Sequence, residues 1–205
     1  MEAKIVYFEK SGDVNTNEVL NIAKQRAEEL GIKTIVLAST TGKTGVKAVE
    51  ICRGMNVVVV GYATGFMRYP PNVNPFTDEN RRIIESKGGK IINATHALAG
   101  ISTAARNQFN GFGLGEVIAH TLRMFGPGIK VACEVAAMAA DAALARTDED
   151  VIAMGGTGRE GGGCDAAVVL TPANVHNFFE LRVKEILCKP LTSPVPPKRE
   201  APRPK

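Results

Sequence analysis

The chain has 205 residues, which is enough for one well-buried domain and short for two. Its formal net charge of +4 lies mostly at the C-terminal end, where residues 191–205 carry +3 and leave only +1 for residues 1–190. So small a charge on the body gives no reason to expect a nucleic-acid partner, and no stretch approaches the ~20 apolar residues that span a bilayer.

The four cysteines, Cys52, Cys133, Cys164 and Cys188, are widely spaced and include no Cys-x-x-Cys pair. This spacing predicts neither a metal site nor a disulfide framework, and it favours reduced thiols. Cys164 has no histidine near it in the sequence, so we expect a small buried residue rather than a reactive thiol. The N-terminal stretch carries an acidic residue, Glu2, and has too short an apolar run for a signal peptide, so we expect a cytoplasmic protein.

Strands and helices alternate in the first half of the chain. The apolar patterns predict strands at 4–8, 34–38, 57–60 and 90–93, with helices over about 15–30, 44–53 and 77–88 between them. Val57 to Val60 is β-branched and apolar on both faces, which is typical of a strand in the middle of a parallel sheet. Residues 68–75 contain three prolines and are predicted to be irregular.

The second half is less regular. Residues 97–145 show no strand pattern, and we predict helices over about 114–124 and 129–144, with strands at 151–154, 166–170 and, half-exposed, 179–184. The helix at 129–144 is apolar almost all round, so it is packed on several sides or lies in a homo-oligomer interface. Glu134 and Asp141, seven residues apart on this helix, are interpreted as a solvated stripe rather than a catalytic pair.

The order of elements predicts a three-layer α/β/α sandwich with a mainly parallel central sheet. We expect a single domain over residues 1–190 and a disordered, Pro-rich, basic tail over 191–205. Ligands of such sheets bind beyond the C-terminal ends of the strands. The loops that follow the strands, at 8–12, 39–44, 61–66, 94–96 and 155–163, are therefore expected to share one edge.

The turn from Ser39 to Thr44 is the strongest candidate site. Ser39, Thr40 and Thr41 are helix N-cap types, and Gly42 permits a tight turn. A helix that begins here points free N–H groups, its positive dipole end and Lys43 at one place, which suits a phosphate. The alternative is an ordinary capped helix. Thr41-Gly42-Lys43-Thr44 matches the end of a P-loop, but Leu37 replaces the required glycine, which argues against a nucleoside triphosphatase.

The run Gly156-Thr157-Gly158-Arg159-Glu160-Gly161 has the letters Gly-x-Gly-x-x-Gly after a predicted strand. It does not open a helix, so the dinucleotide-binding interpretation fails. What remains is a loop whose backbone can approach a ligand, with Arg159 able to pair with a phosphate or a ring carbonyl. The alternative is a long surface hairpin loop. His96 follows a strand on the same edge and is a further candidate for ligand contact.

Residues 27–37, the Ser/Thr-Gly turn with Lys43-Thr44 and the strand 57–61 resemble the C-terminal α/β domain of pyruvate kinase. The resemblance covers roughly residues 14–65. In that family the domain carries an allosteric site whose Ser/Thr-rich turn binds an effector phosphate, which implies the same role here for Ser39, Thr40, Thr41 and Thr44. The catalytic barrel is missing from this chain, so kinase activity is not implied.

Thr95 to Gly100 and the Gly-rich loop look more like a group of stand-alone archaeal proteins built on this domain, which implies bound flavin mononucleotide (FMN). The phosphate would then lie at Ser39–Thr44 and the ring near Gly61, Thr64, His96 and the loop 155–163, with redox chemistry supplied by the flavin. Two alternatives remain open: a non-enzymatic sensor of a phosphorylated metabolite, and a protein that docks a partner through its tail.

Overall fold

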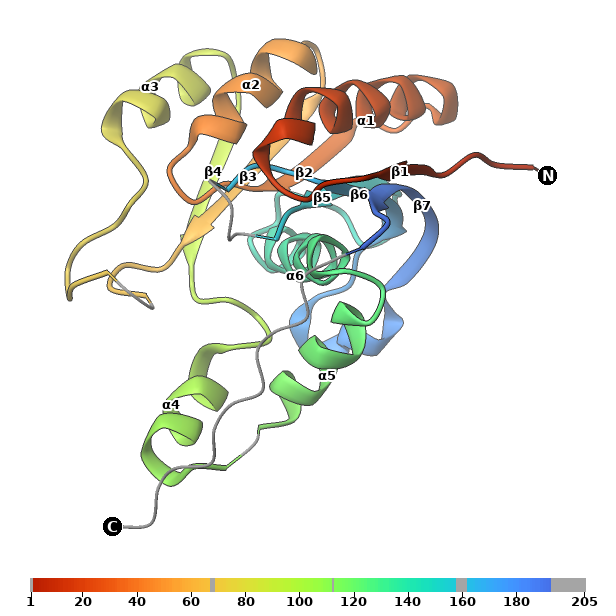
Figure 1. Cartoon of the computed structure of the whole chain (residues 1–205). Coiled ribbons are helices and arrows are strands. Elements are labelled where there is room, and N and C mark those ends of the chain that lie inside the picture. The colour runs from red at the N-terminus through yellow and green to blue at the C-terminus, as the bar shows by residue number, and fades with distance from the viewer. Residues whose placement is uncertain (1, 67–68, 112, 158–161, 193–205) are drawn as a thin grey trace.

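A sheet of seven strands runs through the part of the chain that the computed structural model describes, which is residues 2–66, 69–111, 113–157 and 162–192 (Figure 1). The strand order is β1-β7-β6-β5-β2-β3-β4. The strands are β1 (Val6–Phe8), β2 (Thr34–Ala38), β3 (Asn56–Tyr62), β4 (Lys90–Ala94), β5 (Val151–Gly155), β6 (Ala166–Thr171) and β7 (Arg182–Pro190). Only β6 runs against the others among these strands, so the mainly parallel sheet is confirmed.

Helices cover both faces of this sheet (Figure 1). On one face lie α1 (Thr16–Leu30), α2 (Lys43–Ile51) and α3 (Asp78–Ser86), and on the other lies α6 (Pro127–Asp141). The shorter helices α4 (Gly100–Phe109) and α5 (Leu114–Arg123) extend from the side of α6, and two 3-10 segments, η1 (Asp13–Asn15) and η2 (Val175–Glu180), complete the structure. No helix in the described ranges has the length and apolar character needed to cross a membrane.

The central strands are buried on both sides because alternate residues serve two cores. Leu37 and Val59 pack with α1 and α2, whereas Val36 and Val58 pack with α6. A strand buried on both faces needs a continuous apolar run, which β2 and β3 have. The three-layer arrangement predicted from the sequence is therefore the one observed.

Two predictions for the second half of the chain were wrong or incomplete. Residues 100–109 form a helix, α4, that the sequence pattern did not indicate, because this helix buries none of its residues and so has no apolar stripe. The predicted strand 179–184 begins only at Arg182, since Val175 to Glu180 form η2, and the strand then continues to Pro190. Most of the predicted tail, residues 193–205, lies outside the described residues.

The apolar helix α6 is covered by the sheet, by α5 and by η2, which accounts for its composition without a partner chain. The prediction of a solvated stripe on this helix was wrong for Glu134, whose side chain is only 2% exposed. Asp141 is exposed at the end of the helix and accepts hydrogen bonds from Asn174 and Val175. Glu134 therefore needs a different explanation from Asp141.

Candidate functional site

The carboxyl ends of β5, β2, β3 and β4 lie next to one another, which brings most of the predicted site residues to one edge. The register pairs Leu37 with Met154, Ala38 with Val60, and Tyr62 with Ala94. Since neighbouring strands are about 4.8 Å apart, the ends of β2 and β4 are separated by roughly 10 Å. Gly158 and Arg159 lie outside the described residues, so their place at this edge stays a prediction.

In the turn between β2 and α2, no described residue caps the start of α2 with its side chain. The N-cap is Gly42, at a φ of 92°, rather than one of the three hydroxyl residues before it. The hydroxyl residues therefore lie in the turn before the helix, but none of them is the cap. Ser39 is buried and donates its N–H to the Val60 carbonyl at 2.9 Å. Thr44 is buried as well, whereas Lys43, the first helical residue, is exposed. No side-chain cap among the described residues thus satisfies the N–H groups of this helix start, which suits an anion.

The loop before α3 holds this turn in place. The Thr41 carbonyl accepts hydrogen bonds from the Thr77 N–H at 3.2 Å and from Asn80 Nδ2 at 2.9 Å. A Cβ atom on Gly42 would lie 2.6 Å from Cβ of Asn80 and 2.8 Å from the Phe76 ring. Both the positive φ and this close approach therefore require glycine at position 42.

The end of β3 is covered by side chains from two neighbouring segments. Gly61 is buried, and a Cβ atom on it would lie 2.5 Å from Asn93 Nδ2. Asn74 Nδ2 donates to the Tyr62 carbonyl at 3.0 Å and to Thr64 Oγ1 at 3.4 Å. Gly61 thus serves internal packing, whereas Thr64 is exposed at the edge.

His96 follows β4 and lies against two aromatic rings. Its ring centroid is 4.8 Å from that of Tyr62 and 4.7 Å from that of Phe66. Its Nδ1 atom is 3.9 Å from Oε2 of Glu134, and the side chain is 18% exposed. Burial lowers the pKa of His96, while the nearby carboxylate of Glu134 opposes this shift. A neutral imidazole with partial access to the edge is the result.

Two charged residues of α6 complete this cluster. Glu134 accepts the Leu98 N–H at Oε1, at 2.9 Å, and the Lys130 ammonium donates to Oε2. The Lys130 side chain is 7% exposed, and its burial lowers the pKa of the ammonium against the opposing effect of Glu134. Lys130 was not among the predicted site residues, and Glu134 was predicted to lie in a solvated stripe, although a charged pair four residues apart in an apolar helix is a readable signal.

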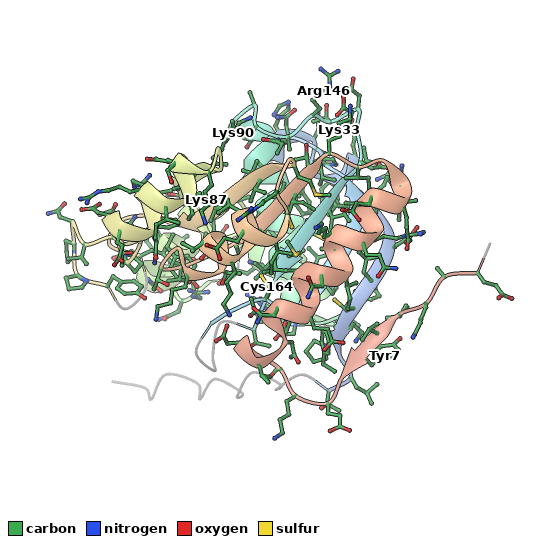
Figure 2. All side chains as sticks on the ribbon, turned by 90° about the horizontal axis from the view of Figure 1, so that it is seen from above. Tyr7, Lys33, Lys87, Lys90, Arg146 and Cys164 are labelled. Carbon is green, nitrogen blue, oxygen red and sulfur yellow. The ribbon has the colours of Figure 1, made fainter. Side chains whose placement is uncertain are left out.

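The Gly-rich loop joins two antiparallel strands, as the hairpin alternative required. At its described ends, the carbonyl of Gly163 blocks any side chain at Gly156. Asp165 Oδ2 accepts the Gly12 N–H at 2.9 Å and the Thr157 N–H at 3.4 Å, and burial raises the pKa of this carboxyl. Cys164 is fully buried beside the start of α1, which confirms its structural interpretation (Figure 2). The described ends of the loop are therefore held by the protein itself.

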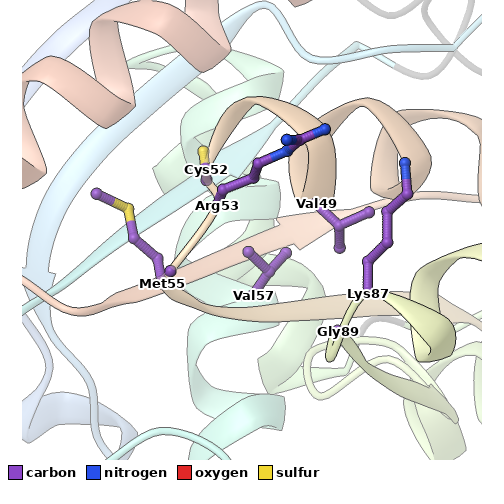
Figure 3. Close-up of a pocket in the computed structure, with 8 residues that line it drawn as sticks. Val49, Cys52, Arg53, Met55, Val57, Lys87 and Gly89 are labelled. Atoms are coloured by element: carbon purple, nitrogen blue, oxygen red, sulfur yellow. The ribbon is translucent and has the colours of Figure 1, made fainter.

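A hollow of about 300 Å³ lies elsewhere, where β3 begins (Figure 3). Its lining includes Val49, Met55 and Arg53, together with Lys87, whose ammonium is paired with Glu50 at 2.5 Å. This is the amino edge of the parallel strands, opposite the edge where ligands of such sheets bind. This hollow therefore lies outside the candidate site.

The mainly parallel sheet, the helices on both faces and the polar carboxyl edge define the chain as an α/β domain with its candidate ligand site beyond the strand ends. More specifically, residues 17–170 match the family model described as the alpha/beta domain of pyruvate kinase, and the chain belongs to this family.

Similarity to solved structures is low. Pyruvate kinase of Cryptosporidium parvum in complex with ADP is 14% identical, with a TM-score of 0.38, and the match covers 82% of this chain and 23% of that one. An O-ureido-L-serine synthase is 18% identical, with a TM-score of 0.29 and coverage of 68% and 50%. A hydrogen sulfide-producing enzyme of Fusobacterium nucleatum is 19% identical, with a TM-score of 0.28 and coverage of 56% and 39%. The chain thus spans at most half of each of these proteins.

Proposed function

We propose that this chain binds a phosphorylated small molecule at the carboxyl edge of the sheet, with the phosphate at the start of α2. The open, uncapped helix start carries this proposal. Free N–H groups, the helix dipole and exposed Lys43 all favour an anion there.

We further propose that the molecule is FMN. Tyr62, Phe66 and His96 form a cluster of flat side chains, which suits a planar ring. This cluster follows β3 and β4, one and two strands away from the helix start that follows β2, so one elongated molecule can reach both places. When bound, the flavin supplies electron transfer, while the protein positions it and excludes water.

Riboflavin, which lacks the phosphate, provides a direct test. Fluorescence titration of the purified protein should give an affinity for FMN at least tenfold higher than that for riboflavin, since the phosphate interacts with the start of α2. Equal affinities would contradict the phosphate site, and no binding of either flavin would contradict the FMN proposal. Inorganic phosphate should compete with FMN and not with riboflavin.

A non-enzymatic sensor of a phosphorylated metabolite is the second candidate. The chain spans 23% of the pyruvate kinase chain that it matches, so it can correspond to only a part of that enzyme. Thermal unfolding against a panel of sugar phosphates and nucleotides separates the two proposals. A ligand present at 100 times its dissociation constant should add about 2.7 kcal/mol of stability. Stabilisation by a sugar phosphate and not by FMN would favour the sensor.

We also propose that the chain forms a homo-oligomer in the cytoplasm, through α4 and α5 rather than α6. These two helices expose Ile101 and Leu114 by 84% and 70%, and Met124, directly after α5, is 82% exposed. A helix of ten residues with no buried residue is marginal in water and needs cover. Light scattering should show an oligomer that Leu114→Asp dissociates, whereas Val14→Asp, at an exposed valine of η1, leaves it intact. A wild-type monomer would contradict this.

A further inference from the structure

The buried charges on α6 exceed what its packing requires. Taking two charges out of water costs several kcal/mol per ion unless they are well paired, and apolar residues can often replace them without loss. Glu134 does accept a hydrogen bond from the Leu98 N–H, but a neutral glutamine could accept that hydrogen bond too. The ionised carboxylate, with Lys130 beside it, therefore points to a role in which its charge matters.

The geometry of His96 indicates what that role is. Glu134 lies on the Nδ1 side of the imidazole, at 3.9 Å. A carboxylate on this side favours the tautomer that carries its proton on Nδ1, which leaves the lone pair on Nε2. Distances of this kind are commonly long before a ligand binds and shorten in the complex. Nε2 is then the atom of His96 that is available to a ligand.

We propose that His96 accepts a proton at Nε2 from the molecule bound at this edge, and that Glu134 is a positioning residue that fixes the imidazole and stabilises its charged form. This rests on the ligand site proposed above. The proton leaves an acidic O–H, N–H or carbonyl-activated C–H group, and its electron pair stays on the ligand. The imidazolium is then stabilised through Nδ1–H by the carboxylate of Glu134, whose other close partner at Oε2 is the Lys130 ammonium.

The class of ligand follows from the spacing of the two parts of the site. Two strand spacings, roughly 10 Å, separate the phosphate turn after β2 from His96 after β4 along the edge of the sheet, and His96 lies beside α6, on the face opposite α2, so this is the smallest distance between the two parts. The ligand is therefore a phosphorylated compound whose acidic group lies at least that far from its phosphate, in a flat portion that Tyr62 and Phe66 can cover. A flavin ring, with its ionisable N–H, fits this description.

The charges around His96 give two substitutions with opposite signs. Desolvation is the largest effect on the pKa of His96 and lowers it, Glu134 raises it, and Lys130 lowers it. Tyr62 and Phe66 face the ring from the end of β3, and Arg123 and Cys133 act on Lys130. Glu134→Gln should therefore lower the pKa of His96, and Lys130→Met should raise it.

Nuclear magnetic resonance of the ligand-free protein, labelled with ¹⁵N-histidine, measures both the tautomer and the pKa of His96. We expect the Nδ1–H tautomer of His96 in the wild type and the two opposite pKa changes in the variants. Exposed His176 serves as an internal control whose resonances should be the same in the wild type and the variants. An Nε2–H tautomer, or pKa changes of the same sign, would overturn the proposal. The tautomer is read without any substitution, so a variant that fails to fold does not prevent the test.

FMN then serves as the probe for the bound state. Its addition should move the Nε2 resonance of His96, whereas inorganic phosphate, which reaches only the helix start, should not. Bound FMN that leaves this resonance unchanged would overturn the role of His96. The ligand-free tautomer and pKa values do not depend on FMN binding, so a failure of the FMN proposal is recognised separately, by the absence of any flavin binding.

Discussion

The starts of α2 and α3 lie side by side, but only the start of α3 has a side chain that caps its free N–H groups. At α3, Thr77 accepts the Asn80 N–H at 3.2 Å, and Asp78 and Glu79 add negative charge in the first turn. At α2, Gly42 replaces the capping side chain, and there is no acid in the first turn. One helix start is satisfied by its own side chains, whereas the other has no such cap and is the one at which we propose that a phosphate binds. The comparison sets a capped helix start beside the proposed binding one.

Among substitutions at the two helix starts, Gly42→Ala should have the largest effect on the stability of the protein. A methyl group at a φ of 92° is strained, and it would collide with Asn80 and Phe76, so we expect a loss of about 3 kcal/mol in the free energy of unfolding. Gly31→Ala is the control, because Gly31 has a φ of 69° but no atom within 4 Å, and it should cost only about 1–2 kcal/mol. Urea denaturation measures both. Equal losses would mean that the contact from α3 is unimportant.

Lys43→Ala should weaken FMN binding about tenfold, or ~1.4 kcal/mol, and leave riboflavin binding and stability unchanged. Lys47→Ala removes the same charge one turn further along α2 and should change the FMN affinity much less. The difference between the two variants should shrink as salt is added. Identical effects of both variants would assign the result to overall charge rather than to the helix start.

Thr77→Ala, at the start of α3, should have the reverse effect, which is a loss of stability without a loss of FMN binding. Loss of the cap should cost about 1 kcal/mol of stability and leave the FMN affinity within twofold of the wild type. Ser86→Ala, at the other end of α3, is the control for the loss of an exposed hydroxyl. A large loss of FMN affinity in Thr77→Ala would show that the two helix starts are not independent.

Thr41→Asp should produce the smallest change in stability and the clearest separation of the two roles. A carboxylate just before the open start of α2 should stabilise the protein by about 0.5 kcal/mol through the helix dipole. The same charge should repel the phosphate and abolish the preference for FMN over riboflavin. Thr41→Asn, similar in shape but neutral, is the control. Destabilisation by the aspartate with tighter FMN binding would contradict both statements.

The sequence indicated the layers of the fold because β2 and β3 are continuous apolar runs and their neighbouring helices carry regular apolar stripes. It also indicated the turn at Ser39, since hydroxyl residues and glycine after a strand form a local signal. The actual cap, Gly42, depends on Phe76 and Asn80, which come more than thirty residues later. No local pattern contains that information.

The cluster around His96 was harder to predict for the same reason. Glu134 reaches the Leu98 N–H across 36 residues of sequence, so its burial depends on how α6 packs against the exit of β4. Helix α4 was missed because it has no buried side. Periodicity reports local burial, and these two features depend on tertiary contact or on the lack of it.

The pairing of β1 with β7 has a mechanical consequence. The two strands are parallel, with Val6 beside Cys188 and Phe8 beside Pro190, and Lys189 lies over the ring of Tyr7 at the margin of the sheet (Figure 2). A pull that draws the segment before β1 away from the segment after β7 acts along these strands in opposite directions. Their hydrogen bonds are then loaded together in shear instead of opening one after another. This margin is built to resist stretching.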